Sequence, residues 1–172
     1  MAKKMLVIIG FVLVSCLVCA ANVTAAKQIK WHPYDEGLAL SQKEGKKIFL
    51  HFYADWCHFC KEMKKRTFAN NDIIDYLNEN FISILIDTDK EGKLTATYFV
   101  RGLPATFFLK PDGTKINVPI EENKSMSNIP GFISDDMFLK LIRFIHDDSY
   151  NSMNFKHYIE KSASGEGTSK PQ

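Results

Sequence analysis

The chain has 172 residues, of which 45% are hydrophobic, 12% aromatic and 24% charged. This length and composition suit a globular protein of one domain, and they exclude a wholly disordered chain, a collagen-like repeat and a protein with many membrane spans. The net charge is +2, and it falls to zero if Lys3 and Lys4 are removed with the N-terminus. A neutral chain without clusters of lysine and arginine argues against a nucleic-acid partner and against an anionic membrane surface.

The first 26 residues have the pattern of a secretory signal peptide. Lys3 and Lys4 precede an almost uninterrupted apolar run over residues 6–21, and small residues follow up to Ala26. The run is roughly 16 residues long, shorter than the ~20 that a membrane-spanning helix needs. We therefore expect cleavage after Ala26 and an exported protein whose compartment is the bacterial periplasm.

Two other interpretations of this segment stay open. The apolar run can serve as an uncleaved N-terminal anchor. Residues 13–16 also resemble a bacterial lipoprotein box, in which Cys16 would carry the lipid and hold the mature protein at a membrane surface. In all three interpretations the rest of the chain is exported.

Residue patterns downstream of the signal alternate between helix and strand. In chain order they predict a turn over 31–34, a helix over 35–43, a strand over 48–54, a helix over 57–66, a helix over 71–80, a strand over 81–87, a short helix over 91–99, a strand over 105–109, a returning strand over 115–118 after the turn at 111–113, and a helix over 135–146. This alternation indicates an α/β fold, with a central mixed β-sheet that is flanked by helices.

One domain is predicted over residues 27–150, followed by a C-terminal extension over 151–172. In the extension, residues 155–160 favour a turn of helix, and the Ser- and Gly-rich stretch from about residue 162 predicts disorder. The polar segment 119–130 precedes the last helix of the domain. We expect it to be a tolerated surface insertion, and selection of a partner is the alternative.

Two of the four cysteines, Cys57 and Cys60, lie outside the predicted signal and three residues apart. So short a loop contributes little as a staple, and the pair therefore indicates chemistry. Zinc needs about four ligands, and the sequence has no second Cys pair or paired His motif. A c-type haem needs His after the second Cys, where Lys61 stands. We expect no cofactor and no metal, although a copper site built on the two thiols stays open.

The predicted strand over 48–54 delivers Cys57 to the start of the next helix. Free N–H groups and the helix dipole stabilise an anion there, which favours the thiolate, the nucleophilic form of cysteine. Cys60 follows one turn later, close enough to attack a mixed disulfide on Cys57.

Residues 53–61 (YADWCHFCK) and 102–108 (GLPATFF) resemble the thioredoxin superfamily. They are most similar to the periplasmic C-terminal domain of the transmembrane thiol-disulfide reductant conductor DsbD and to its free-standing exported relatives. The resemblance covers roughly residues 46–145 and implies the thioredoxin fold.

The resemblance also implies a role for each residue of these motifs. Cys57 would attack and Cys60 would resolve, with Trp56 packed beside them. Pro104 would be cis and face the disulfide, so that the backbone of Leu103 is presented to an extended substrate. Phe59, on the rim, would contact protein substrates.

Two positions depart from the family pattern. His51 stands where thioredoxins usually carry a buried Asp that helps deprotonate the resolving thiol. It either tunes that step or is a core histidine bonded to backbone. His58, between the cysteines, would favour the Cys57 thiolate and raise the redox potential.

We therefore expect an exported thiol-disulfide oxidoreductase that acts on disulfide-bonded protein substrates, as a monomer and in the reducing direction. Its electrons would come from an upstream thiol reductant, such as a membrane reductant conductor. The alternatives are a disulfide oxidase or isomerase, which His58 favours, and a non-catalytic or metal-carrying module.

Overall fold

The computed structural model describes residues 27–164 of the chain. The elements in order are β1 (Trp31–His32), α2 (Tyr34–Glu44), β2 (Lys47–Tyr53), α3 (His58–Lys65), the 3₁₀ turn η2 (Thr67–Ala69), α4 (Asn71–Asn80), β3 (Phe81–Asp87), α5 (Gly92–Thr97), β4 (Ala105–Leu109), β5 (Val118–Glu121), β6 (Lys124–Met126), β7 (Ile129–Pro130), α6 (Asp135–His146), η3 (Ser149–Asn151) and α7 (Phe155–Ala163). None of the helices in this part of the chain is long and apolar enough to span a membrane.

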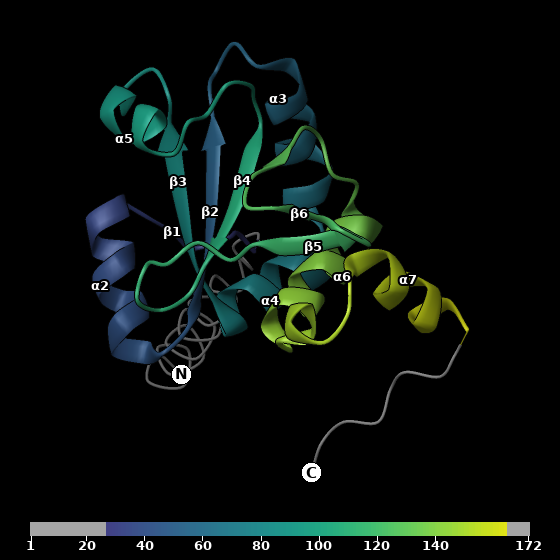
Figure 1. Cartoon of the computed structure of the whole chain (residues 1–172). Helices are drawn as coiled ribbons and strands as arrows, with labels where there is room; N and C mark the ends of the chain where they lie inside the picture. The colour runs from purple at the N-terminus through teal and green to yellow at the C-terminus, as the bar shows by residue number, and fades with distance from the viewer. Residues whose placement is uncertain (1–26, 165–172) are drawn as a thin grey trace, which may run out of the picture.

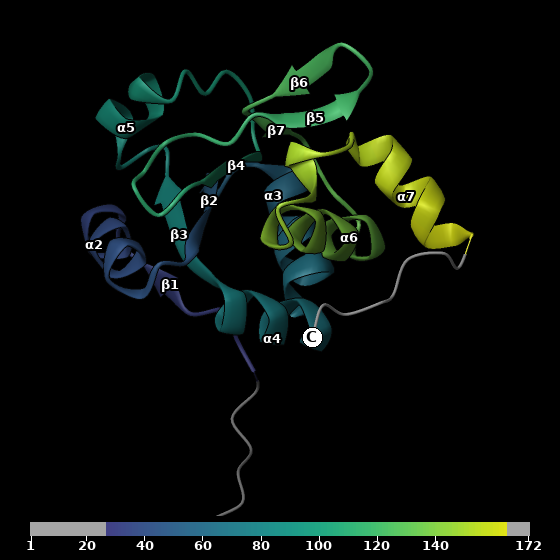
Figure 2. The same ribbon diagram turned by 60° about the horizontal axis from the view of Figure 1, so that its bottom comes forward.

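A five-stranded mixed sheet in the order β1-β3-β2-β4-β7 forms the centre of the molecule (Figure 1). β1 and β2 run parallel to β3, whereas β4 is antiparallel to β2 and β7 is antiparallel to β4. Helices α2 and α5 cover one face, and α3, α4 and α6 cover the other (Figures 1 and 2). The predicted α/β architecture is therefore confirmed.

The central strand β2 is apolar along its length because both of its faces are buried. Ile48, Leu50 and Phe52 point into the core under α2 and α5, while Phe49 joins the core under α3, α4 and α6. Alternation of side chains along a strand produces this division, and helices on both faces explain the nearly continuous apolar run.

Helix α2 packs closely on β3 because Gly37 lies at the contact. A Cβ atom at this position would overlap Cγ1 of the buried Ile84. Gly37→Ala should therefore lower the free energy of unfolding by ~1–3 kcal/mol, the usual cost of overpacking. Gly92→Ala is the matched control, since nothing lies within 4 Å of its added Cβ. Urea denaturation measures both, and equal midpoints for the two variants would refute the close packing.

The predicted returning strand over 115–118 forms only at Lys115 and Ile116, and Val118 belongs to a different sheet. The turn forms as expected, with the Gly113 N–H donating to the Lys110 carbonyl at 2.9 Å. Lys115 pairs with Leu109, and the Ile116 N–H donates to the Phe108 carbonyl at 2.8 Å. The chain then leaves the sheet because Val118 is buried in the core under α6. Segment 119–130 is correspondingly not a plain loop: it holds most of the β5–β6 hairpin, and β7 returns to pair with β4.

Two shorter predictions also differ from the structure. Residues 31–32 form the strand β1 rather than a turn. At the other end, α7 is nine residues long and includes Ser162 and Ala163, beyond the predicted turn of helix. Phe155 and Tyr158 of α7 pack on Phe144 of α6, with ring centroids 5.3 and 5.1 Å from that of Phe144. The two helices lie side by side (Figure 2). This packing accounts for the longer helix. The predicted signal and residues 165–172 lie outside the described part.

Candidate active site

Cys57 and Cys60 form a disulfide at the start of α3, with their Cα atoms 5.3 Å apart. Cys57 caps the helix, because its Sγ accepts a hydrogen bond from the Cys60 N–H at 3.1 Å. Each cysteine is only 6% exposed, and Ala54, Tyr53 and Leu103 pack around the pair. A sulfur that accepts a helix N–H is well placed to carry negative charge once the disulfide opens.

The Leu103–Pro104 peptide bond is cis, as the family resemblance implied. Pro104 is buried, and its carbonyl accepts a hydrogen bond from the Gly131 N–H at 2.8 Å. Leu103 belongs to the apolar cluster around the cysteines. The loop before β4 therefore lies against the disulfide.

Trp56 lies at the surface rather than in the apolar cluster around the cysteines. Its side chain is 69% exposed, and its indole N–H donates to both carboxylate oxygens of Asp89, at 3.0 and 3.2 Å. Phe59 is 57% exposed, as a rim residue should be, and its ring contacts that of the exposed His58. The loop before α3 thus exposes Trp56 to solvent, and the first turn of α3 exposes Phe59.

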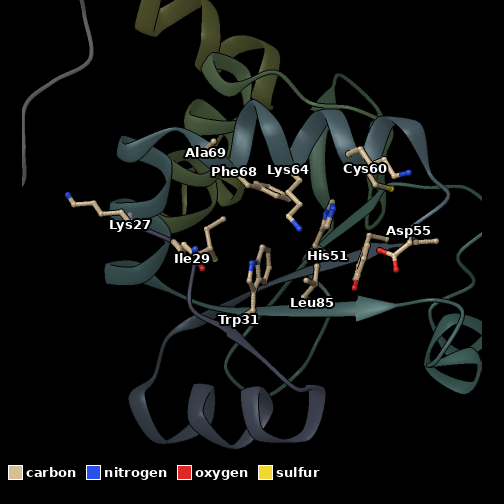
Figure 3. A pocket seen from close by; sticks show the side chains of 14 residues that line it. Lys27, Ile29, Trp31, His51, Asp55, Cys60, Lys64, Phe68, Ala69 and Leu85 are labelled. Atoms are coloured by element: carbon tan, nitrogen blue, oxygen red, sulfur yellow. The ribbon is translucent and has the colours of Figure 1, made fainter. Parts of the chain in front are cut away.

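His51 is buried in the centre of β2, and its Nδ1 lies 3.1 Å from Oγ1 of Thr106 on β4. Its ring also packs edge-on against Phe68, with centroids 5.0 Å apart. Burial lowers the pKa of His51 to about 3, so the imidazole is neutral at physiological pH. His51 and Cys60 line the same cavity (Figure 3). The partner of His51 is therefore a side chain, not the backbone.

Phe99 is a surface residue that the sequence placed at the end of a predicted helix. It is 75% exposed and adopts a left-handed backbone with φ of 54°. It opens the loop that leads to Leu103, at the same end of the sheet as the loop before α3 (Figure 1). Neither its exposure nor its backbone conformation has a signal in the sequence, because Phe ordinarily avoids both.

Within residues 27–164, no three His, Cys, Asp or Glu side chains are gathered so that they could hold a metal ion. Outside the cysteine pair, the arrangement offers a buried neutral imidazole and exposed aromatic rings. The reactive group that this arrangement presents is the Cys57–Cys60 pair.

A family model described as a thioredoxin-like domain matches residues 34–146, well over half of the chain. The chain belongs to this family. It is similar to the thiol:disulfide interchange protein DsbD of Pseudoalteromonas atlantica, at 31% identity over 109 residues, which are 61% of this chain and 17% of DsbD. It is also 32% identical over 96 residues to spermatogenesis-associated protein 20 of Rattus norvegicus, covering 51% of this chain and 12% of that protein. The chain thus spans less than a fifth of either relative.

Solved structures show the same thioredoxin fold. A thioredoxin-fold protein from Helicobacter pylori superposes with a TM-score of 0.58 at 18% identity, covering 76% of this chain and 99% of that one. A thioredoxin from Thermus thermophilus gives a TM-score of 0.55 at 24% identity, covering 69% and 87%. The predicted fold and the predicted similarity to DsbD are both confirmed.

Proposed function

We propose that this thioredoxin-like protein is an exported thiol-disulfide oxidoreductase that exchanges disulfides with protein substrates through Cys57 and Cys60. The observation that carries the proposal is the Cys57–Cys60 disulfide at the start of α3, with the loop of Leu103 and Pro104 packed against it. Membership of the thioredoxin-like family and the similarity to DsbD support it.

The reaction proceeds by two thiol-disulfide exchanges. The Cys57 thiolate attacks a substrate disulfide, so that one substrate sulfur leaves as a thiolate and the other forms a mixed disulfide with Cys57. The Cys60 thiolate then attacks Sγ of Cys57 and releases the second substrate thiol. The substrate is reduced by two electrons and the pair is oxidised, and an upstream dithiol reductant reverses this change.

His51 orients the Cys60 thiol during the second exchange as a neutral hydrogen-bond acceptor, because burial lowers its pKa to about 3 and makes it a weak base. In the tautomer whose Nδ1–H donates to Thr106, Nε2 carries a lone pair, and no described residue bonds to it. A neutral imidazole beside the cavity that Cys60 also lines can accept a hydrogen bond from the thiol, directly or through water, while the proton leaves to solvent. His51→Ala should consequently slow release of the mixed disulfide and change its pH profile.

The similarity to DsbD favours the reducing direction, whereas His58 beside Cys57 favours an oxidase or isomerase. The test supplies the mature protein with dithiothreitol and a disulfide-bonded protein, and follows the release of substrate thiols. Turnover is expected, and none would overturn the proposal. Equilibration with glutathione then fixes the direction: a potential near ~ −270 mV indicates a reductase, and one near ~ −120 mV an oxidase.

Trp56, Phe59, Phe99 and the loop of Leu103 and Pro104 form the surface that receives the substrate, named here the substrate surface. The described residues include three large hydrophobic side chains that are mostly exposed, and these are Trp56, Phe59 and Phe99. Trp56 lies in the loop before α3, Phe59 in the first turn of α3 and Phe99 in the loop after α5. These segments lie at the disulfide end of the sheet (Figure 1). An apolar rim of this kind buries readily against an extended peptide.

Phe99→Gly should change stability and activity in opposite directions. Glycine adopts a positive φ without cost, so the variant's free energy of unfolding should rise by roughly 1 kcal/mol. Its unfolding temperature should rise accordingly. It should also lower kcat/KM several-fold for a protein disulfide, but not for the small reagent 5,5′-dithiobis(2-nitrobenzoate). Phe99→Asn, which tolerates this backbone conformation, separates side-chain loss from backbone relief. Unchanged activity of both variants on protein substrates would remove Phe99 from the substrate surface.

Export predicts a mature protein whose N-terminus is Lys27 and which is released with the periplasmic fraction. Intact-mass spectrometry of the protein purified from its native cells checks this. A diacylglycerol adduct on Cys16 would replace the soluble form with the lipoprotein, and a retained Met1 would indicate the uncleaved anchor.

A further inference from the structure

A cavity of about 600 Å³ lies beside Cys60, on the face of the sheet that α3 covers (Figure 3). His51 and Leu85, paired across β2 and β3, lie in its wall. The small side chains of Ala54 and Ala69 leave the space open. None of the described residues that line it belongs to the substrate surface, but Cys60 and His51 do line it, so the cavity adjoins the disulfide on the side away from that surface's residues.

One wall of the cavity is aromatic. Trp31 and Phe68 pack edge-to-face with ring centroids 5.6 Å apart, and both are only partly buried. The buried Ile29 extends this apolar surface toward Lys27, where the described part of the chain begins. An apolar wall with room beside it is the usual setting for the body of a small organic ligand.

The charged groups around the cavity are mainly positive: Lys27, Lys61 and Lys64, against Asp55. Lys27 is paired with Asp75, at 2.6 Å. Lys61 and Lys64 are exposed, and neither has an ion-pair partner within residues 27–164. Figure 3 shows Lys64 reaching from α3 across the cavity toward Trp31 and His51. These two ammonium groups favour an anion.

A buried polar group in the wall points to the same space. His51 is 1% exposed, and its Nδ1 is bonded to Thr106, whereas Nε2 has no partner among the described residues. Among the described residues, the fully buried polar side-chain atoms without a partner are Ser83 Oγ and Asn128 Oδ1, and Nε2 of His51 is not one of them. Solvent or a ligand in the cavity that His51 lines can therefore reach Nε2.

We propose that this cavity binds a small organic anion with an apolar body, such as a medium-chain carboxylate. The apolar body packs on Trp31 and Phe68, and the anionic group lies against the ammonium groups of Lys61 and Lys64. Because the site needs both features, it discriminates against a neutral molecule and against a cation of the same shape.

Octanoate is the probe, with octan-1-ol and octylammonium as controls of matched chain length. Titration of the mature protein by calorimetry should show saturable binding of octanoate, weaker in high salt, and at least tenfold weaker binding of the two controls. Chemical-shift changes in the protein NMR spectrum should centre on the Trp31 indole and Phe68. Shifts centred on Trp56 or Phe59 instead would overturn the proposal.

Three variants test the residues that carry the site. Lys61→Gln with Lys64→Gln should weaken octanoate binding roughly tenfold, whereas Lys65→Gln, one residue outside the lining on the same helix, should not. Ala69→Trp should fill the cavity and abolish binding, and thermal unfolding verifies that each variant folds. No saturable binding to the wild type, or equal binding by the double lysine variant, would refute the site and leave the disulfide chemistry untouched.

Discussion

Cys57→Ser should abolish disulfide exchange, and Cys60→Ser should instead accumulate mixed disulfides with substrate. The two sulfurs occupy different places: Sγ of Cys57 accepts a helix N–H, whereas Cys60 lies in the first turn and lines the cavity with His51. Only the first is stabilised as the attacking thiolate, and a serine there leaves no nucleophile. Loss of the second blocks resolution, so the intermediate persists.

The measurement separates these outcomes directly. Each variant is mixed with a disulfide-bonded protein, quenched with acid and alkylating agent, and separated on a non-reducing gel. A reductant-sensitive adduct should appear with Cys60→Ser alone, while turnover with Cys57→Ser should fall to the level of dithiothreitol alone. A Cys57→Ser protein that keeps its full biological activity would favour the non-catalytic module instead.

The neutral state of His51 should make the folded protein sensitive to acid. Burial lowers the pKa of His51 from 6.5 to about 3, so below pH 6.5 the unfolded chain binds a proton that the folded protein excludes. The stability contributed by the neutral ring is complete above pH 6.5 and falls as the pH decreases toward 3. The loss is about 1.4 kcal/mol per pH unit, or roughly 2 kcal/mol between pH 7.5 and 5.

Urea unfolding of wild type and His51→Gln at pH 7.5 and pH 5 isolates this contribution. The glutamine variant starts from a lower stability because it disturbs the core, but its stability should fall less between the two pH values. His157→Gln removes an exposed histidine of α7 and should keep the wild-type slope. An identical pH slope in all three proteins would show that His51 titrates normally.

Local patterns sufficed to predict the elements that pack in the usual way. The strands over 81–87 and 105–109 and the helix over 135–146 have the predicted bounds, because their apolar periodicity is strong and their ends carry clear signals. The cysteine pair and its helix start follow from one short motif. These features need no knowledge of distant contacts.

Features that depend on distant contacts were missed. Val118 and Phe155 are buried only because α6 brings its own apolar face to them, so neither the departure of β5 nor the length of α7 can be seen locally. Trp31, Lys64 and Phe68 meet around one cavity although three elements supply them. Phe99 is the opposite case, because a large apolar side chain that would be expected in the core is held at the surface by the loop that carries it.

The strand β1 runs parallel to β3, with Trp31 opposite Ser83. Lys27 therefore lies toward the end of the sheet where β3 begins, whereas the disulfide follows the carboxyl end of the parallel strand β2 (Figure 1). A tether attached ahead of Lys27, such as a lipid anchor, a fused reporter or a sensor surface, would hold the molecule by the edge of the sheet that is remote from the disulfide. A protein immobilised through its N-terminus should therefore keep its disulfide facing outward and accessible to large protein substrates.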